Sequence, residues 1–138
     1  MAGDGAFGIS MNEMVSCGRD SWPPITMIVF RNYQWGAEKR NTTLWYADNF
    51  VGTELDKTVS YAKIAEACGV KGVQVDSMDS LAATLEEAVR AQMEDGVTTF
   101  IEVVLNQELG EPFRRDAMTT PVVVAGIDKK DMCQQEGA

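Results

Sequence analysis

Residues 3–8 read GDGAFG, and residues 25–32, further along the chain, read ITMIVFRN. The apolar run over residues 25–30 predicts a buried strand that ends at Asn32. Between the two motifs we expect a helix that begins after Gly5 and has Met11, Met14, Val15 and Gly18 on one face. Gly3 and Gly5 allow a tight backbone turn. The sequence therefore predicts that the strand returns Asn32 to a position beside Asp4.

Asp4 and Asn32 are the residue types that a metal-bound diphosphate requires. Mg²⁺ takes oxygen ligands and usually combines one or two protein oxygens with phosphate oxygens and water. Asp4 would supply a carboxylate and Asn32 an amide oxygen. The N–H groups at the start of the following helix would face the diphosphate, as at many anion sites. The alternative is a surface turn at residues 3–5 with Asn32 as a strand-end cap, because Asp-Gly is an ordinary turn sequence.

Longer motifs carry a more specific resemblance. They are GDGAFGISMNEM, RNYQWGAEKRN, NFVGTELD and ELGEPFRRDAM, within residues 3–118. Together they resemble the C-terminal, diphosphate-binding domain of the sulfoacetaldehyde acetyltransferases, which are thiamine-diphosphate enzymes. We therefore expect this domain, in part, at residues 1–118 and a C-terminal tail at residues 119–138. One departure is Arg31, because the strand of the family usually ends in paired Asn or in His-Asn.

The resemblance implies thiamine diphosphate and Mg²⁺ as cofactors. Its metal ligands would be Asp4, Asn32 and the main-chain carbonyl of Gln34. The cofactor-binding set adds the backbone at the first turn, namely Gly3, Gly5, Ala6 and Phe7. The implied reaction converts sulfoacetaldehyde and phosphate to acetyl phosphate and sulfite. Lys39 and Arg40 are candidates to receive the sulfonate or the phosphate, although a solvated charged face predicts the same letters.

No catalytic residue is expected in this chain. In such enzymes the Glu that promotes ylid formation lies in a pyrimidine-binding domain, and the site forms between two subunits. We therefore expect a fragment of a homo-oligomeric enzyme that is inactive by itself. Two alternatives stay open: an acetolactate-synthase-like carboligase or 2-oxo acid decarboxylase domain, and a non-catalytic orphan α/β binding domain.

Composition limits the function classes. A chain of 138 residues has the length of a single domain, and 45% of its residues are apolar, which is enough for a hydrophobic core. A net charge of −9 argues against nucleic acid and anionic membranes as partners. The absence of His excludes imidazole ligands and His-based triads. The cysteines, Cys17, Cys68 and Cys133, are expected to be free thiols, which favours the cytoplasm.

Strands alternate with helices, which predicts an α/β fold with three layers and a parallel sheet. We expect a helix over residues 60–69 with Ser60 as its N-cap, a strand over 72–75, a helix over 80–95 with an outer Glu86–Arg90 pair, and a strand over 98–105. Residues 33–50 are expected to form an active-site loop with a short helix, or a wedge for subunit packing. Glu102 is expected at an exposed strand edge or in an ion pair rather than as a catalytic acid. Because only Met1 and Ala2 precede Gly3, the first strand is expected to be truncated.

Overall fold

A computed structural model describes residues 1–108, except for the side chains of Leu44 and Trp45. The chain divides into two compact units. Unit 1 comprises Met1–Tyr33 and Asp56–Gln107, and unit 2 comprises Gln34–Leu55 and Glu108–Ala138. The expected tail at residues 119–138 lies outside the described residues, as does Cys133.

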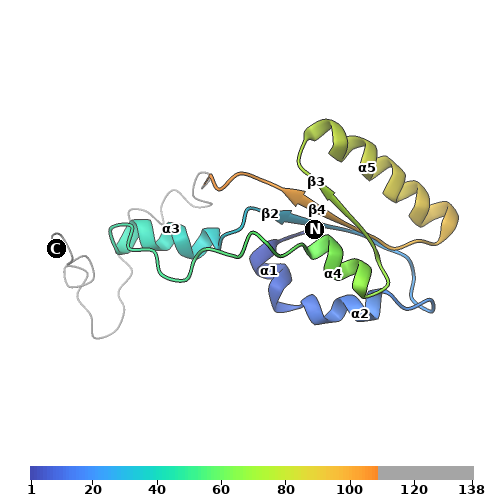
Figure 1. Cartoon of the computed structure of the whole chain (residues 1–138), viewed down its shortest axis with the longest axis horizontal. Helices are drawn as coiled ribbons and strands as arrows, with labels where there is room; N and C mark the ends of the chain where they lie inside the picture. The colour runs from blue at the N-terminus through green and yellow to red at the C-terminus, as the bar shows by residue number, and fades with distance from the viewer. Residues whose placement is uncertain (109–138) are drawn as a thin grey trace. The chain divides into compact units, whose positions relative to one another are not determined.

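Unit 1 is built on a parallel sheet (Figure 1). Its strands are β1 (Ala2–Gly3), β2 (Thr26–Arg31), β3 (Lys71–Val75) and β4 (Thr99–Val104), in the spatial order β1-β2-β4-β3. All three strand pairs are parallel, which confirms the predicted sheet type. The strand before the first turn is short but present, since Ala2 pairs with Val29 and Gly3 with Phe30.

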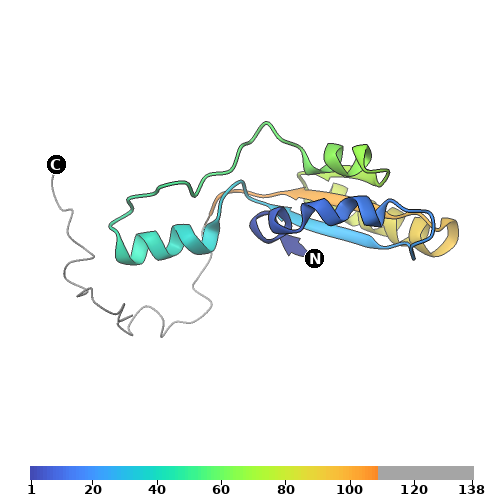
Figure 2. The ribbon, with the colours of Figure 1, turned by 90° about the horizontal axis from the view of Figure 1, so that it is seen from below.

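Short helices cover one face of this sheet (Figure 2). They are α1 (Asp4–Ile9), the 3₁₀ turn η1 (Met11–Glu13), α2 (Met14–Cys17) and α4 (Tyr61–Ala67). The single helix predicted after Gly5 is therefore broken, because Ser10 donates its N–H to the Phe7 carbonyl in a tightened last turn. Met14 is buried as predicted, but Val15 is 58% exposed, because the break changes which side chains face the sheet.

The opposite face is covered by α5 (Met78–Arg90), which continues as the π-helical turn η2 (Ala91–Asp95). The helix begins earlier than predicted because Ser77, rather than Ser80, is the N-cap. Gly96 ends it at a φ of 69°, a left-handed conformation that suits glycine. In place of the predicted Glu86–Arg90 pair, Nη1 of Arg90 at the end of α5 lies 3.9 Å from Oε2 of Glu94 in η2.

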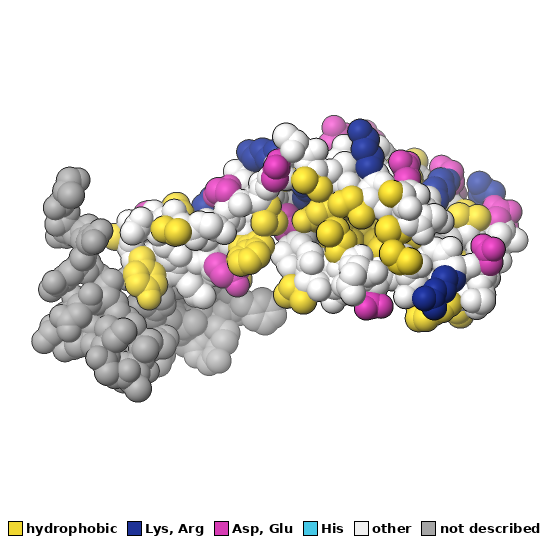
Figure 3. All heavy atoms as spheres, turned by 60° about the horizontal axis from the view of Figure 1, so that its bottom comes forward, with side chains coloured by type: hydrophobic (Ala, Val, Ile, Leu, Met, Phe, Trp, Pro, Cys, Tyr) yellow, Lys and Arg dark blue, Asp and Glu magenta, His cyan; other side chains and the backbone are white. Residues whose placement is uncertain are grey.

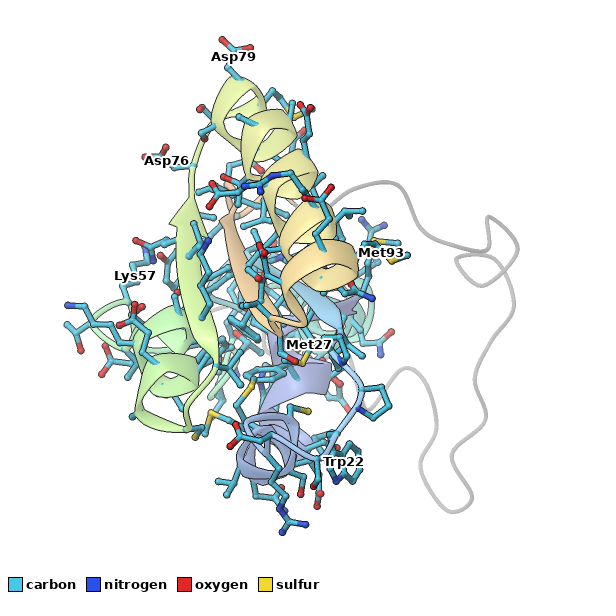
Figure 4. All side chains as sticks on the ribbon, turned by 90° about the vertical axis from the view of Figure 1, so that its right-hand side faces the viewer. Trp22, Met27, Lys57, Asp76, Asp79 and Met93 are labelled. Carbon is cyan, nitrogen blue, oxygen red and sulfur yellow. The ribbon has the colours of Figure 1, made fainter. Side chains whose placement is uncertain are left out.

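Successive side chains of a strand point to opposite faces of the sheet, so the core consists of two clusters, one under the short helices and one under α5. Phe100 and Val29 pack with Met14, Ala65 and Val70 beneath the short helices. Ile101 and Val103 pack with Val75 and Ala88 beneath α5. In Figure 4 the carboxyl end of β3 is marked by Asp76 and the start of α5 by Asp79, while Trp22 lies at the other end of the sheet. Figure 3 shows apolar side chains at the surface of the short-helix layer, where Ile9 is 84% exposed.

Unit 2 contains the helix α3 (Gly36–Trp45), as expected for a loop with a short helix. An isolated bridge joins Gln34 to Glu54, and Trp35 donates its N–H to the Thr53 carbonyl. Tyr46 and Phe50 are substantially exposed. Among residues 1–108, no helix is long and apolar enough to cross a membrane.

Candidate functional site

Asp4 lies where β1 meets α1, and it is buried with 4% of its surface exposed. Its Oδ1 accepts the N–H of Gly5 at 2.9 Å, and its Oδ2 accepts the N–H of Tyr33 at 2.9 Å. β1 and β2 are parallel neighbours, so their carboxyl ends lie at the same end of the sheet. The backbone that follows Asn32 therefore contacts the Asp4 carboxylate through the Tyr33 N–H. Asp4 is thus an ordered bridge between two segments, and a simple surface turn does not describe residues 3–5.

The backbone bends sharply after Asn32. Tyr33 has a φ of 59°, in the left-handed region that residues with a Cβ rarely adopt. Its N–H is held by Asp4, and its carbonyl accepts a hydrogen bond from Nε2 of Gln107 at 3.3 Å. Strained backbone of this kind concentrates at functional sites, where the surrounding structure fixes it. No residue pattern predicts this conformation here, since Tyr is an unusual residue for a left-handed backbone.

Arg31 and Glu102 form a buried ion pair under the same segment. Nη1 of Arg31 lies 2.7 Å from Oε1 of Glu102, and the side chains are 1% and 0% exposed. Glu102 is on the interior strand β4, and its ion pair confirms the second of the two expected positions, which were an exposed edge or an ion pair. The pair could have been predicted from one cation and one anion interrupting two otherwise apolar strands, because buried charges require partners.

Tyr61, the first residue of α4, completes this cluster. Its ring lies 4.0 Å from the guanidinium carbon of Arg31 and 5.2 Å from the Phe7 ring. Burial raises the pKa of Tyr61 above its usual range, and the nearby positive charge of Arg31 partly opposes this shift. The phenol therefore stays neutral at ordinary pH. The sequence predicted only a helix over residues 60–69 at this position, and the contact of Tyr61 with the charged pair was missed.

In unit 2, Gln34 and Lys39 already interact. Gln34 is 1% exposed, and its Oε1 accepts a hydrogen bond from Nζ of Lys39 at 3.0 Å. Lys39 also forms an ion pair with Glu54 and lies 5.1 Å from the centre of the Phe50 ring. Arg40 is half-buried. Of the two candidate anion-binding cations, Lys39 is thus held by a carboxylate and an amide of its own unit.

The residues of the first turn are compatible with a diphosphate-bound Mg²⁺. An ionised carboxylate can accept about four hydrogen bonds or ligand contacts, so the two N–H contacts of Asp4 leave lone pairs for a cation. A Cβ built on Gly3 would meet no atom within 4 Å, so the space beside this backbone is open. Within the described part of the chain, no three His, Cys, Asp or Glu side chains are grouped so that they could hold a metal ion.

The cysteines, the ELGEPFRRDAM motif and Ser60 were also singled out in the sequence. Cys17 and Cys68 are free and pack, half-buried, against the core under the short helices, as predicted. In the motif ELGEPFRRDAM only Glu108 belongs to the described residues. Ser60 is the N-cap of α4 as predicted, since its hydroxyl accepts the N–H of Lys63.

The chain is similar in sequence to known proteins. The chain is 69% identical over 134 residues to a probable sulfoacetaldehyde acetyltransferase of Rhizobium meliloti, covering 97% of this chain and 22% of the relative. It is 63% identical to a sulfoacetaldehyde acetyltransferase of Roseovarius nubinhibens, covering 98% of this chain and 22% of the relative. The chain thus spans about a fifth of the length of these relatives, and the resemblance stated from the motifs is confirmed.

The fold has solved counterparts. A benzoylformate decarboxylase from Polynucleobacter necessarius superposes with a TM-score of 0.67 at 24% identity, over 78% of this chain and 19% of that chain. This likeness confirms the α/β fold class. Residues 1–103 match the model of the thiamine pyrophosphate enzyme, C-terminal TPP binding domain, which confirms thiamine diphosphate as the predicted cofactor. The chain belongs to this family of C-terminal thiamine-pyrophosphate-binding domains.

Proposed function

We propose that this chain binds the diphosphate of thiamine diphosphate through Mg²⁺ at the edge where β1 and β2 end. The proposed metal ligands are the Asp4 carboxylate, the Asn32 amide oxygen and the main-chain carbonyl of Gln34. The observation that carries the proposal is the pair of hydrogen bonds by which Asp4 joins the start of α1 to Tyr33. This bridge holds a carboxylate close to the backbone of Tyr33, the residue after Asn32.

The first turn would hold the diphosphate itself. Gly3 offers open space next to the backbone, and Gly5, Ala6 and Phe7 belong to the first turn of α1, where N–H groups have no carbonyl acceptor in the preceding turn. The Gly5 N–H donates to the Asp4 carboxylate, so the N–H groups of Ala6 and Phe7 are the proposed donors to the diphosphate. Bound there, the cofactor would supply carbanion stabilisation, while this chain binds and orients it. The residues proposed to touch it are therefore binding residues, and the activating Glu is expected outside these 138 residues.

Calorimetric titration of Asp4→Ala with thiamine diphosphate and Mg²⁺ tests this assignment. The variant should lose cofactor binding, and Asn32→Ala should weaken it less, because water can replace a neutral ligand more readily than a carboxylate. Asp76→Ala is the matched control, since Asp76 is exposed beyond β3, the strand at the opposite edge of the sheet from β1 (Figure 4). Unchanged affinity in Asp4→Ala would refute the metal site.

For the longer protein that contains such a domain, we propose sulfoacetaldehyde acetyltransferase activity. The support is the 69% and 63% identity to relatives with that name, over nearly the whole chain. Release of sulfite from sulfoacetaldehyde, in the presence of phosphate, is the expected result. Release of carbon dioxide from a 2-oxo acid would favour the carboligase or decarboxylase alternative. The 138-residue chain alone should produce no acetyl phosphate.

Lys39 and Arg40 remain the proposed contacts for the sulfonate or phosphate of the substrate. An anion at Lys39 would have to compete with Glu54, so we expect the larger effect from Arg40. In the active longer protein, Arg40→Ala should raise KM for an anionic substrate, whereas Arg19→Ala, at an exposed arginine, should not. An unchanged KM in Arg40→Ala would assign the Arg40 side chain to a solvated face.

We propose the cytoplasm as the location and a homo-oligomer as the state of the longer protein. The free thiols of Cys17 and Cys68 support a reducing compartment. Cell fractionation and light scattering test these two points. Recovery of the protein outside the cytoplasm, or a monomeric mass, would contradict them.

A further inference from the structure

The Arg31–Glu102 pair is more than a means of burying two charges. Removing two ions from water is costly, and apolar residues of similar volume often stabilise a core equally well. The rest of the core in both layers shows that this fold can be filled with apolar side chains. The contacts of the pair therefore need an explanation other than stability alone.

The guanidinium of Arg31 contacts four separate groups. Nη1 binds Glu102, and Nη2 donates to the Asp56 carbonyl at 2.9 Å. The ring of Tyr33 lies 4.6 Å from the guanidinium carbon and that of Tyr61 lies 4.0 Å from it. A planar, forked guanidinium can make such contacts at once, which an ammonium cannot. Within the described residues, only its Nε lacks a hydrogen-bond partner.

The carboxylate of Glu102 extends these contacts to α4. Its Oε1 binds Arg31, while its Oε2 accepts hydrogen bonds from the Ser60 hydroxyl and the Ala62 N–H, each at 3.0 Å. The start of α4 is thus tied to β4, and β4 is tied through Arg31 to the end of β2. All these residues belong to unit 1.

We propose that Arg31 and Glu102 are a buried positioning pair that fixes the Asn32–Tyr33 turn for metal binding. The turn is held on one side by Asp4, which accepts the Tyr33 N–H, and on the other by Arg31, which contacts the Tyr33 ring. This double hold maintains the left-handed backbone of Tyr33 and so orients the adjacent Asn32. The metal part of this inference rests on the proposed function, whereas the ordering of the turn does not.

Hydrogen–deuterium exchange of the purified, cofactor-free chain tests the ordering directly. Arg31→Lys keeps the charge but not the fork, and Glu102→Gln keeps the shape but not the charge. In both variants, amides in residues 31–36 should exchange about tenfold faster than in the parent, while those in residues 78–90 of α5 change by less than about twofold. Exchange that rises equally in both segments would overturn the proposal.

Ile101→Val or Ile101→Ala, whichever matches the thermal midpoint of the pair variants, is the control. Ile101 is adjacent to Glu102 on β4 but packs in the α5 layer. The Ile101 variant should raise amide exchange to a similar extent in residues 31–36 and in residues 78–90. Where Glu102→Gln does not fold, Tyr61→Leu serves instead, because it removes one stacking ring and leaves the ion pair. Unchanged exchange of residues 31–36 in Tyr61→Leu and Arg31→Lys would also overturn the proposal.

Calorimetry adds the functional measurement. With Mg²⁺ present, Arg31→Lys should bind thiamine diphosphate about tenfold more weakly than the parent, and the Ile101 control should bind it equally well. If Arg31→Lys binds like the parent while Asp4→Ala does not bind, the pair has no positioning role and the metal site stands. If the parent and Asp4→Ala bind thiamine diphosphate with equal affinity, the proposed function is refuted. The ordering role of the Arg31–Glu102 pair is then tested by the hydrogen–deuterium exchange result alone.

Discussion

On the face of the sheet beneath α5, the described residues bury Val75, Ile101 and Val103 and no charged side chain. On the opposite face, one residue away along the same strands, Arg31 and Glu102 are buried next to Phe100. The two faces share their strands and hydrogen-bonding ladder, so the difference lies in the side chains. The apolar face provides cohesion, whereas the charged face connects the core to the turn at Asn32 and Tyr33.

The largest effect should come from breaking the charged face at Glu102. Glu102→Ala leaves the Arg31 guanidinium buried without its carboxylate, which should lower the free energy of unfolding by about 3–5 kcal/mol. Urea denaturation measures the change. Arg31→Met combined with Glu102→Met should recover much of the loss, because the uncompensated charge is gone. A double variant as unstable as Glu102→Ala would show that the lost hydrogen bonds to α4, rather than the stranded charge, dominate.

The second prediction concerns how closely α4 approaches the charged face. A Cβ on Gly72 would lie 2.1 Å from the carbonyl oxygen of Ala62, so Gly72→Ala must push α4 away from β3. Overpacking of this kind costs about 1–3 kcal/mol. It should also loosen the Ala62–Glu102 hydrogen bond. Gly3→Ala, where a Cβ meets no atom within 4 Å, is the control for stability. Equal unfolding midpoints for the two variants would contradict the packing argument.

A milder change tests the apolar face. Ile101→Val removes one buried methylene and should cost about 0.5–1.5 kcal/mol. Because Ile101 belongs to the α5 layer, binding of thiamine diphosphate should be unchanged once the protein is folded. Thermal unfolding and calorimetry on the same sample separate the two effects. Weakened binding at full folding would mean that the two faces are coupled.

The smallest expected effect is at alkaline pH. The folded-state pKa of Tyr61 is raised, so folding favours the protonated phenol. Its contribution to stability is complete below the ordinary pKa of about 10 and is lost as pH rises through the higher folded value. Tyr61→Phe should therefore reduce the loss of stability above that pH. Identical alkaline unfolding profiles for the parent and Tyr61→Phe would contradict the assignment.

Much of the fold could be predicted from local sequence. The apolar runs at residues 25–30 and 98–105 became β2 and β4 with shifts of one residue at their ends, and Ser60 capped α4 as expected. The helix after Gly5 was predicted as continuous, but it breaks near Ser10. The spacing of apolar residues predicts which side chains share a helix face. It does not predict where the helix must break so that Met14 can pack against the sheet.

The candidate site was only partly predictable. The proximity of the Asp4 and Asn32 segments followed from two parallel strands that end at one edge. The contact of Arg31 with Tyr61 joins residues that are distant in the sequence, and its contact with Tyr33 depends on the left-handed backbone of Tyr33, so no spacing rule predicts either contact. The pairing of Glu102 was anticipated, but not its central burial, because strand order depends on the whole topology.

The most direct test of the central claim is the metal dependence of cofactor binding. Thiamine diphosphate is titrated into the purified chain by calorimetry, once with Mg²⁺ and once with EDTA. We predict binding with Mg²⁺ and its loss with EDTA, because the Asp4 carboxylate would otherwise repel the diphosphate. Binding of equal affinity under both conditions would contradict a metal-bridged site at Asp4 and Asn32.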